Sequence, residues 1–146
     1  MIVNPYNEII SLHDVNIKEI KIKNNNAYIK LDQAYMISIN VDYVLDDPLI
    51  IINDLLDIRT NKYYPIRIRL IDDDQVYTPT LEDFNKFKFE ILEESYGFGL
   101  VHFYGIATIF EDDRFVSYNA YLDFHYCGDL EIKWDSKIFV ETYYEF

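Results

Sequence analysis

Glycine and proline are scarce in this chain, with four of each among its 146 residues. The turns must therefore depend on asparagine and aspartate, which tolerate left-handed backbone conformations and hydrogen-bond within their own turns. Three polar clusters are predicted to form such turns: Asn24-Asn25-Asn26, Asp72-Asp73-Asp74 and Glu111-Asp112-Asp113.

Cysteine occurs only once, at Cys127, so no disulfide can form within the chain. This is typical of a reducing compartment, and we expect a cytoplasmic protein. Residues 1–5 contain neither the basic nor the apolar region of a signal peptide, and we expect none. The longest purely apolar runs have four residues, as in Leu49-Ile50-Ile51-Ile52, whereas a membrane-spanning helix needs about 20.

Basic residues are few, since 13 lysines and arginines stand against 26 acidic residues, a net charge of −13. Residues 1–73 contain 11 acids and 8 bases, net −3, and residues 74–146 contain 15 acids and 5 bases, net −10. Such a charge repels nucleic acid and anionic membranes and attracts a basic partner. A requirement for solubility alone also accounts for it.

Hydrophobic and aromatic residues are abundant, at 50% and 17% of the chain. This composition excludes a disordered protein, which needs low hydrophobicity and few aromatics. The length is that of one domain, and we expect residues 1–146 to form a single domain.

Apolar residues recur mostly with a period of two, which predicts β-strands. Lys18-Glu19 breaks the phase of the first strand and predicts a bulge there. Thr80 is predicted to cap a short helix with acids in its first turn. Leu49–Ile58 fits either a buried strand or a short helical turn. The predicted strands are Val15–Ile22, Tyr28–Leu31, Met36–Leu45, Pro65–Ile71, a strand with Phe87, Phe89 and Ile91, Leu100–Phe110, Phe115–Tyr126, Leu130–Trp134 and Ile138–Tyr144.

The last third of the chain reads as a meander in which Leu100–Phe110 is the central strand, because it is apolar on both faces. Strands at spacings near ten residues, joined by short polar turns, are typical of β-sandwiches and curved sheets. We therefore predict a mainly β fold, an antiparallel sandwich or a strongly curved sheet with at most one or two short helices.

Residues that could bind a metal or take part in catalysis are few and scattered along the sequence. The histidines His13, His102 and His125 match no metal-binding spacing, even when Cys127 is added, so we expect no metal. No basic residue lies near Cys127 in the sequence, since the next one along the chain is Lys133, and this favours an inert thiol. There is no serine nucleophile motif or cofactor fingerprint, and we expect neither catalytic residues nor a cofactor.

The N-terminal segment combines Leu12-His13-Asp14, the isoleucines 17, 20 and 22, the asparagine turn, and Ile29 and Leu31. With the C-terminal Gly128-Asp129-Leu130-Glu131-Ile132, it resembles small bacterial β-domain proteins, several of which are similar to immunity proteins that neutralise polymorphic toxins. The resemblance covers roughly the first 20 and the last 20 residues of such a pattern. It implies a non-enzymatic cytoplasmic protein that binds a cognate toxin.

The sequence therefore predicts a non-enzymatic acidic binding protein, and the expected partner is a protein, such as a basic toxin, rather than nucleic acid or a membrane. Two alternatives stay open: an enzyme or ligand-binding β domain with a pocket lined by tyrosines and histidines, and a self-associating structural subunit. Turn acids and strand tyrosines are the expected contacts. The candidates are Glu93, Glu94, Tyr96, Asp112, Asp113, Tyr121, Asp129 and Tyr143.

Overall fold

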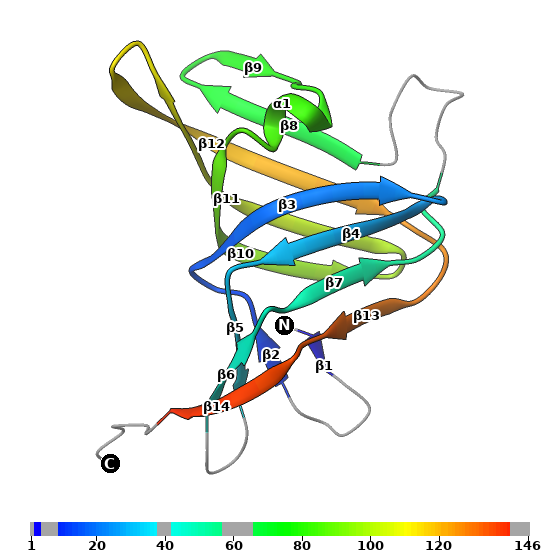
Figure 1. Cartoon of the computed structure of the whole chain (residues 1–146). Helices are drawn as coiled ribbons and strands as arrows, with labels where there is room; N and C mark the ends of the chain where they lie inside the picture. Colours follow the sequence, from blue (N-terminus) through cyan, green and yellow to red (C-terminus); the bar gives the residue numbers. More distant parts are fainter. Residues whose placement is uncertain (1, 4–8, 38–41, 57–65, 141–146) are drawn as a thin grey trace.

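The computed structural model describes residues 2–3, 9–37, 42–56 and 66–140 (Figure 1). These residues form fourteen β-strands and one four-residue helix, α1 (Leu81–Phe84). The strands are β1 (Ile2–Val3), β2 (Ile9–Ser11), β3 (Val15–Lys23), β4 (Asn26–Leu31), β5 (Ala34–Ile37), β6 (Asp42–Asp46), β7 (Leu49–Ile52), β8 (Ile66–Asp72), β9 (Gln75–Tyr77), β10 (Lys88–Gly97), β11 (Leu100–Glu111), β12 (Arg114–His125), β13 (Leu130–Lys133) and β14 (Ser136–Val140).

Two antiparallel sheets contain all of these strands. The larger has nine strands in the order β13-β7-β4-β3-β10-β11-β12-β8-β9, and the smaller has five in the order β1-β2-β5-β6-β14. The mainly β, antiparallel architecture with one short helix confirms the fold class expected from the sequence.

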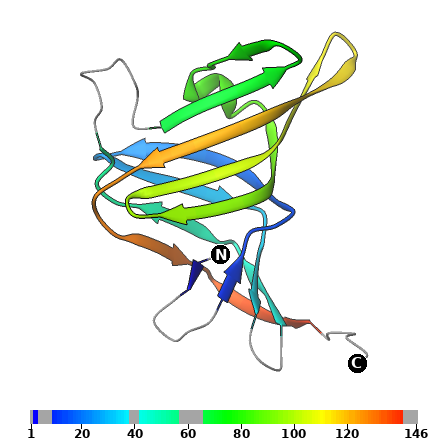
Figure 2. The same ribbon diagram turned by 180° about the vertical axis from the view of Figure 1, so that it is seen from behind.

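The large sheet bends back on itself, so that β3, β4 and β7 face β11, β12 and β8 in both views (Figures 1 and 2). The core fills the space between the two halves. Ile20 and Ile29 belong to one half, and Phe89, Phe103 and Phe124 belong to the other. All five are buried, and no polar or charged residue is buried in the described part of the chain. Burial of these apolar side chains therefore holds the bent sheet together.

The bulge predicted near Lys18-Glu19 is confirmed, since the β3–β4 register shifts between Ile17 and Glu19. The helix is also as expected, because Thr80 Oγ1 accepts a hydrogen bond of 3.1 Å from the amide of Asp83. Leu49–Ile58, which fitted a strand or a helical turn, contains the buried strand β7; residues 57 and 58 lie outside the described residues.

The turns follow the prediction from glycine scarcity. Asn24 and Asn25 have positive φ, as do Asp73, Asp112 and Asp113, whereas Gly99 is the only glycine with positive φ in the described ranges. In the β3–β4 and β11–β12 hairpins, both residues of a two-residue loop have positive φ, the pattern of a type I′ turn. Asparagine and aspartate therefore take the place of glycine here.

The prediction of one long strand over Met36–Leu45 is wrong. β5 and β6 pair with each other, with Ala34 opposite Leu45, so the chain reverses between them. Met36 is buried and Ile37 is exposed, so Met36 rather than Ile37 lies on the core face of β5. Both arms of a hairpin have a period of two, and residues 38–41 contain no glycine or proline to mark the reversal; those four residues lie outside the described ranges.

The predicted meander is correct only for the β11–β12 hairpin, and β11 is a central strand as expected, between β10 and β12. Beyond Cys127-Gly128-Asp129, β13 pairs with β7 and β14 pairs with β6, so the chain leaves the meander and crosses to strands about 80 to 100 residues earlier. β13 and β7 belong to the large sheet, and β14 and β6 belong to the small one. The chain therefore passes from one sheet to the other between β6 and β7 and again between β13 and β14. Residues 141–144 of the last predicted strand lie outside the described residues.

Candidate functional site

The β11–β12 hairpin projects beyond the rest of the large sheet and ends in an exposed aromatic pair (Figure 1). Phe110 and Phe115 lie opposite each other next to the turn, with ring centroids 5.0 Å apart. Their exposed fractions are 59% and 76%. We call residues 110–115 the hairpin tip. Neighbouring exposed aromatic rings of this kind lie outside the core and are available to a partner.

Three consecutive acids, Glu111, Asp112 and Asp113, close the hairpin tip, and all are exposed. Arg114, opposite Glu111, is the single basic residue of the tip. The tip thus combines apolar rings with a net negative charge. Its shape depends on the type I′ turn, in which Asp112 and Asp113 have φ of 50° and 61°.

Further from the turn, the same face of the hairpin carries a polar and aromatic cluster that we call the outer-face cluster: Arg69, His102, Tyr104, Tyr121 and Asp123. The rings of Tyr104 and Tyr121 are 4.9 Å apart, and the Arg69 guanidinium lies 5.1 Å from the centroid of Tyr121. His102 Nδ1 hydrogen-bonds to the Asp123 carboxylate, whose other oxygen lies 3.5 Å from Arg69 Nη2. The cluster is a continuous network across β8, β11 and β12.

The hydrogen bond between His102 and Asp123 orients the imidazole ring. An ionised carboxylate only accepts hydrogen bonds, so opposite an ionised Asp123 it is His102 Nδ1 that donates. The side chains of His102 and Asp123 are 27% and 14% exposed. Ser95 lies opposite His102 on β10, so the three strands place serine, histidine and aspartate in one row.

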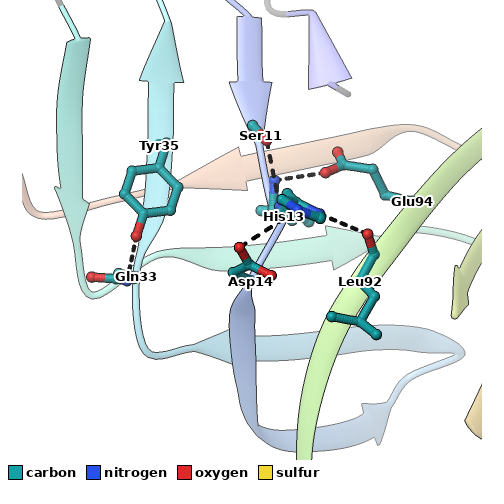
Figure 3. Close-up of polar contacts among 8 residues, drawn as sticks. Ser11, His13, Asp14, Gln33, Tyr35, Leu92 and Glu94 are labelled. Atoms are coloured by element: carbon teal, nitrogen blue, oxygen red, sulfur yellow. Dashed lines mark hydrogen bonds and ion pairs between the residues drawn. The ribbon is translucent and has the colours of Figure 1, made fainter. Parts of the chain in front are cut away.

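A second polar group holds the passage from β2 to β3 against β10 (Figure 3). His13 Nδ1 donates to the carbonyl oxygen of Leu92 over 2.7 Å, and His13 Nε2 lies 3.5 Å from the Asp14 carboxylate. The amide of Leu12 donates to Glu94 Oε2 over 2.7 Å. This group therefore ties segments about 80 residues apart in the chain.

Glu94 also accepts a hydrogen bond of 3.1 Å from the hydroxyl of Tyr96. Burial, together with the adjacent Glu94 carboxylate, raises the pKa of Tyr96 above its usual range. The ring of Tyr96 packs edge-on against Phe103, so the side chain belongs to the core side of β10. Glu94 and Tyr96, which the sequence nominates as partner contacts, thus make internal contacts.

The structure separates the remaining nominated residues. Tyr121 lies in the outer-face cluster, and Glu93 is exposed opposite Tyr104 beside it. Asp112 and Asp113 form the turn of the hairpin tip. Asp129 follows the other end of β12, which at about 3.3 Å per residue is roughly 40 Å away along the strand. Tyr143 lies outside the described residues.

Several residues of this surface were missed by sequence reasoning. The alternating pattern assigns Phe110 and Phe115 to strands but does not indicate that they are exposed. His102 and Asp123 are 21 positions apart in the sequence. One signal was available for the phenylalanines: both lie beside the predicted turn, and residues at the end of a long hairpin extend past the hydrophobic core. Nothing in the sequence indicates the pairing of His102 with Asp123.

The histidines do not converge. His13 lies at the β2–β3 passage, His102 on the outer face, and His125 at the end of β12. In the described ranges, no three histidine, cysteine, aspartate or glutamate side chains are grouped to hold a metal ion. The exposed Cys127 thiol donates to the carbonyl oxygen of Asp54 over 3.4 Å. The one helix of the described chain is too short to cross a membrane.

The chain matches no protein family, no curated protein and no solved structure.

Proposed function

We propose that this chain is a non-enzymatic binding protein of the immunity type, which neutralises a basic protein toxin through the hairpin tip and the outer-face cluster. The observation that carries the proposal is the exposed Phe110–Phe115 pair at the end of a projecting hairpin of two twelve-residue strands. Two large apolar rings in solvent are costly unless a partner covers them.

The composition of the surrounding surface supports this assignment. Interfaces are enriched in tyrosine, phenylalanine and arginine, and a few such residues carry most of the binding free energy. Phe110 and Phe115 continue along the same face into Tyr104, Tyr121 and Arg69. The aromatic pairs already pack against each other at 5.0 and 4.9 Å, so little side-chain entropy is lost when a partner binds.

Charge supports a basic partner. The chain has a net charge of −13, and the hairpin tip contributes three acids against one base. Complementary charge speeds the association of two proteins and selects against wrong partners. Acids around an apolar centre also match the usual anatomy of an interface, with an apolar core and a polar rim.

The test uses the purified chain and the protein encoded beside it as the candidate partner. Phe110→Ser together with Phe115→Ser should weaken binding by at least about 30-fold, the loss of one hot-spot side chain or more. The matched control is Phe98→Ser, which removes a fully exposed phenylalanine from the opposite end of β11 and should leave the Kd within about twofold of wild type. In cells, co-expression of the wild type should protect against the partner.

Two results would contradict the proposal. Equal binding by both phenylalanine variants and the wild type would remove the hairpin tip from the interface. Sedimentation equilibrium that shows the wild type as a dimer, dissociated by the Phe110→Ser and Phe115→Ser changes, would instead favour a self-associating subunit.

A second candidate function is acyl transfer or hydrolysis at the row formed by Ser95, His102 and Asp123. The specific observation is that Asp123 orients the ring of His102, as the acid of a catalytic triad does. Against it, the structure of the described residues shows no hydrogen bond between Ser95 and His102, and the row lies on an open sheet face. We therefore rank this function below partner binding.

Mass spectrometry after treatment with a fluorophosphonate probe tests the second candidate. A triad should give a covalent adduct on Ser95 that is lost in His102→Ala, whereas Thr108→Ala, which changes a hydroxyl further along the same face of β11, should leave labelling intact. Absence of an adduct on Ser95 in the wild type would dismiss it.

A further inference from the structure

An aromatic groove lies on the opposite face of the β11–β12 hairpin from the Phe110–Phe115 pair. It has a volume of about 490 Å³ and lies between β8, β9, the segment around α1, and the hairpin. Leu70, Pro79 and Ile109 contribute its aliphatic walls. The aromatic groove also contains Tyr77, Phe87 and Tyr118.

The three rings form adjacent walls set close to right angles. Tyr118 is 6.1 Å from Tyr77 at 80° and 6.0 Å from Phe87 at 72°. Phe87 is held by stacking on Phe84, which is buried. A ring's face carries the negative part of its quadrupole, so a cation that enters the groove is attracted to any ring face that it contacts there.

The charges at the groove reinforce that preference. Glu111 and Asp83 line the groove, and Lys86 is the one basic side chain in its lining. Lys86 Nζ lies 3.1 Å from Asp83 Oδ1, and Arg114 lies opposite Glu111 on the hairpin. With Asp72, which also acts on Tyr118, acidic side chains outnumber basic ones around the groove. Partial burial, together with Glu111, Tyr77 and Asp72, raises the pKa of Tyr118 although Arg114 opposes this, so its ring stays neutral at physiological pH.

We propose that the aromatic groove binds the cationic side chain of a lysine or arginine from the basic protein partner. This inference rests on the proposed function, because it assigns the ligand that the partner presents to the second face of the hairpin. A partner that covers the hairpin tip would thus contact the Phe110 and Phe115 rings on one face of the hairpin and place one cationic side chain in the groove on the other face. With a volume of about 490 Å³, the groove has room for a lysine or arginine side chain.

Aromatic-region NMR of the full chain tests the proposal without the partner. The probes are N-acetyl-arginine methylamide and N-acetyl-lysine methylamide, with the citrulline methylamide as an uncharged match for the arginine probe, all at constant ionic strength. At least one cationic probe should give saturable shifts of the Tyr77, Phe87 and Tyr118 ring signals, and the citrulline probe should give none.

Three variants of the groove and one control sharpen the test. Tyr118→Leu should weaken the cationic probe by about 2- to 30-fold, the range of a cation–π contact. Glu111→Gln should weaken it by about 2- to 5-fold, as for a surface charge pair, whereas Lys86→Met should strengthen it by a similar factor. Tyr104→Leu, which removes a ring from the other face of the same hairpin, should leave the affinity unchanged.

The opposite signs for Glu111 and Lys86 keep the proposal falsifiable if Tyr118→Leu fails to fold, since both side chains are at the groove rim. Equal binding of the citrulline probe, or a Lys86→Met variant that binds the cation more weakly, would overturn it. The Phe110→Ser, Phe115→Ser variant should bind the probe like the wild type. The two proposals can therefore be refuted independently. Absence of cationic-probe binding in the groove refutes this inference, whereas partner binding that is unaffected by the Phe110→Ser and Phe115→Ser changes refutes the proposed function.

Discussion

The side-chain amide of Asn85 makes two hydrogen bonds with the main chain of Ile20. Asn85 Oδ1 accepts from the Ile20 amide and Asn85 Nδ2 donates to the Ile20 carbonyl oxygen, each over 2.9 Å. β3 pairs with β10 only over Val15–Ile17, so beyond the bulge another group must satisfy this edge of β3. Asn85 provides it and so fastens the segment after α1 to the sheet.

Asn85→Ala should lower the free energy of unfolding by about 1–3 kcal/mol, because it leaves a donor and an acceptor of the main chain without partners. Urea denaturation measures the change. The matched control is Asn119→Ala, which removes an exposed bond to the Tyr104 hydroxyl and should cost less than about 0.5 kcal/mol. Equal losses in the two variants would show that Asn85 does not fasten the segment.

Gly105→Ala should destabilise the large sheet. A Cβ at this position would lie 1.8 Å from the carbonyl oxygen of Glu90 and 3.1 Å from the Phe89 ring, so the backbone of β10 must move. Overpacking of this kind costs about 1–3 kcal/mol or more. Gly97→Ala is the control, because its Cβ would meet only Leu100 Cβ at 3.9 Å. Thermal unfolding that ranks the two variants equally would contradict the prediction.

The raised pKa of Tyr96 predicts a loss of stability at alkaline pH. Burial and Glu94 raise the pKa in the folded state, so above pH 10, where the unfolded tyrosine ionises, the unfolded state loses a proton that the folded state keeps. The contribution is complete below pH 10 and declines above it, at about 1.4 kcal/mol per pH unit. Tyr96→Phe should remove this part of the slope between pH 10 and 11 in urea denaturation. An unchanged slope would show that Tyr96 is not its source.

Neutralising the two turn acids of the hairpin tip should slow association with the partner. Asp112→Asn with Asp113→Gly preserves the type I′ turn, since Asn-Gly is its preferred sequence. Association should slow by about 2- to 10-fold and lose part of its salt dependence, whereas dissociation should change less, because these acids lie at the rim. Stopped-flow measurements at several salt concentrations test this.

Asp129→Asn with Asp135→Asn is the matched control, because it removes the same charge beyond the opposite end of β12. Its association rate should stay closer to that of the wild type. If both double variants slow association equally, the total charge rather than the hairpin tip steers the partner. Absence of salt dependence in the wild type would leave solubility as the reason for the acidic charge.

Local features were predictable wherever the residues near in sequence decide them. The Asn24-Asn25 and Asp112-Asp113 turns follow from the scarcity of glycine, the Thr80 cap follows from the backbone donors of a helix start, and the buried face of β12 follows from a period of two. Prediction failed where two distant segments decide the outcome, as for the reversal between β5 and β6 and the pairing of β13 with β7.

The candidate site shows the same division. The sequence by itself determined an acidic β domain and the Asp112-Asp113 turn, because charge and periodicity are properties of the chain, whereas Glu93 and Glu94, expected in a turn, lie within β10. Only the tertiary structure decided that Glu94 and Tyr96 are used internally, that Asp129 is remote from Asp112, and that His102 meets Asp123. Each of these depends on which strands pair and in which register, and a register is fixed by the burial of a whole face rather than by any one residue.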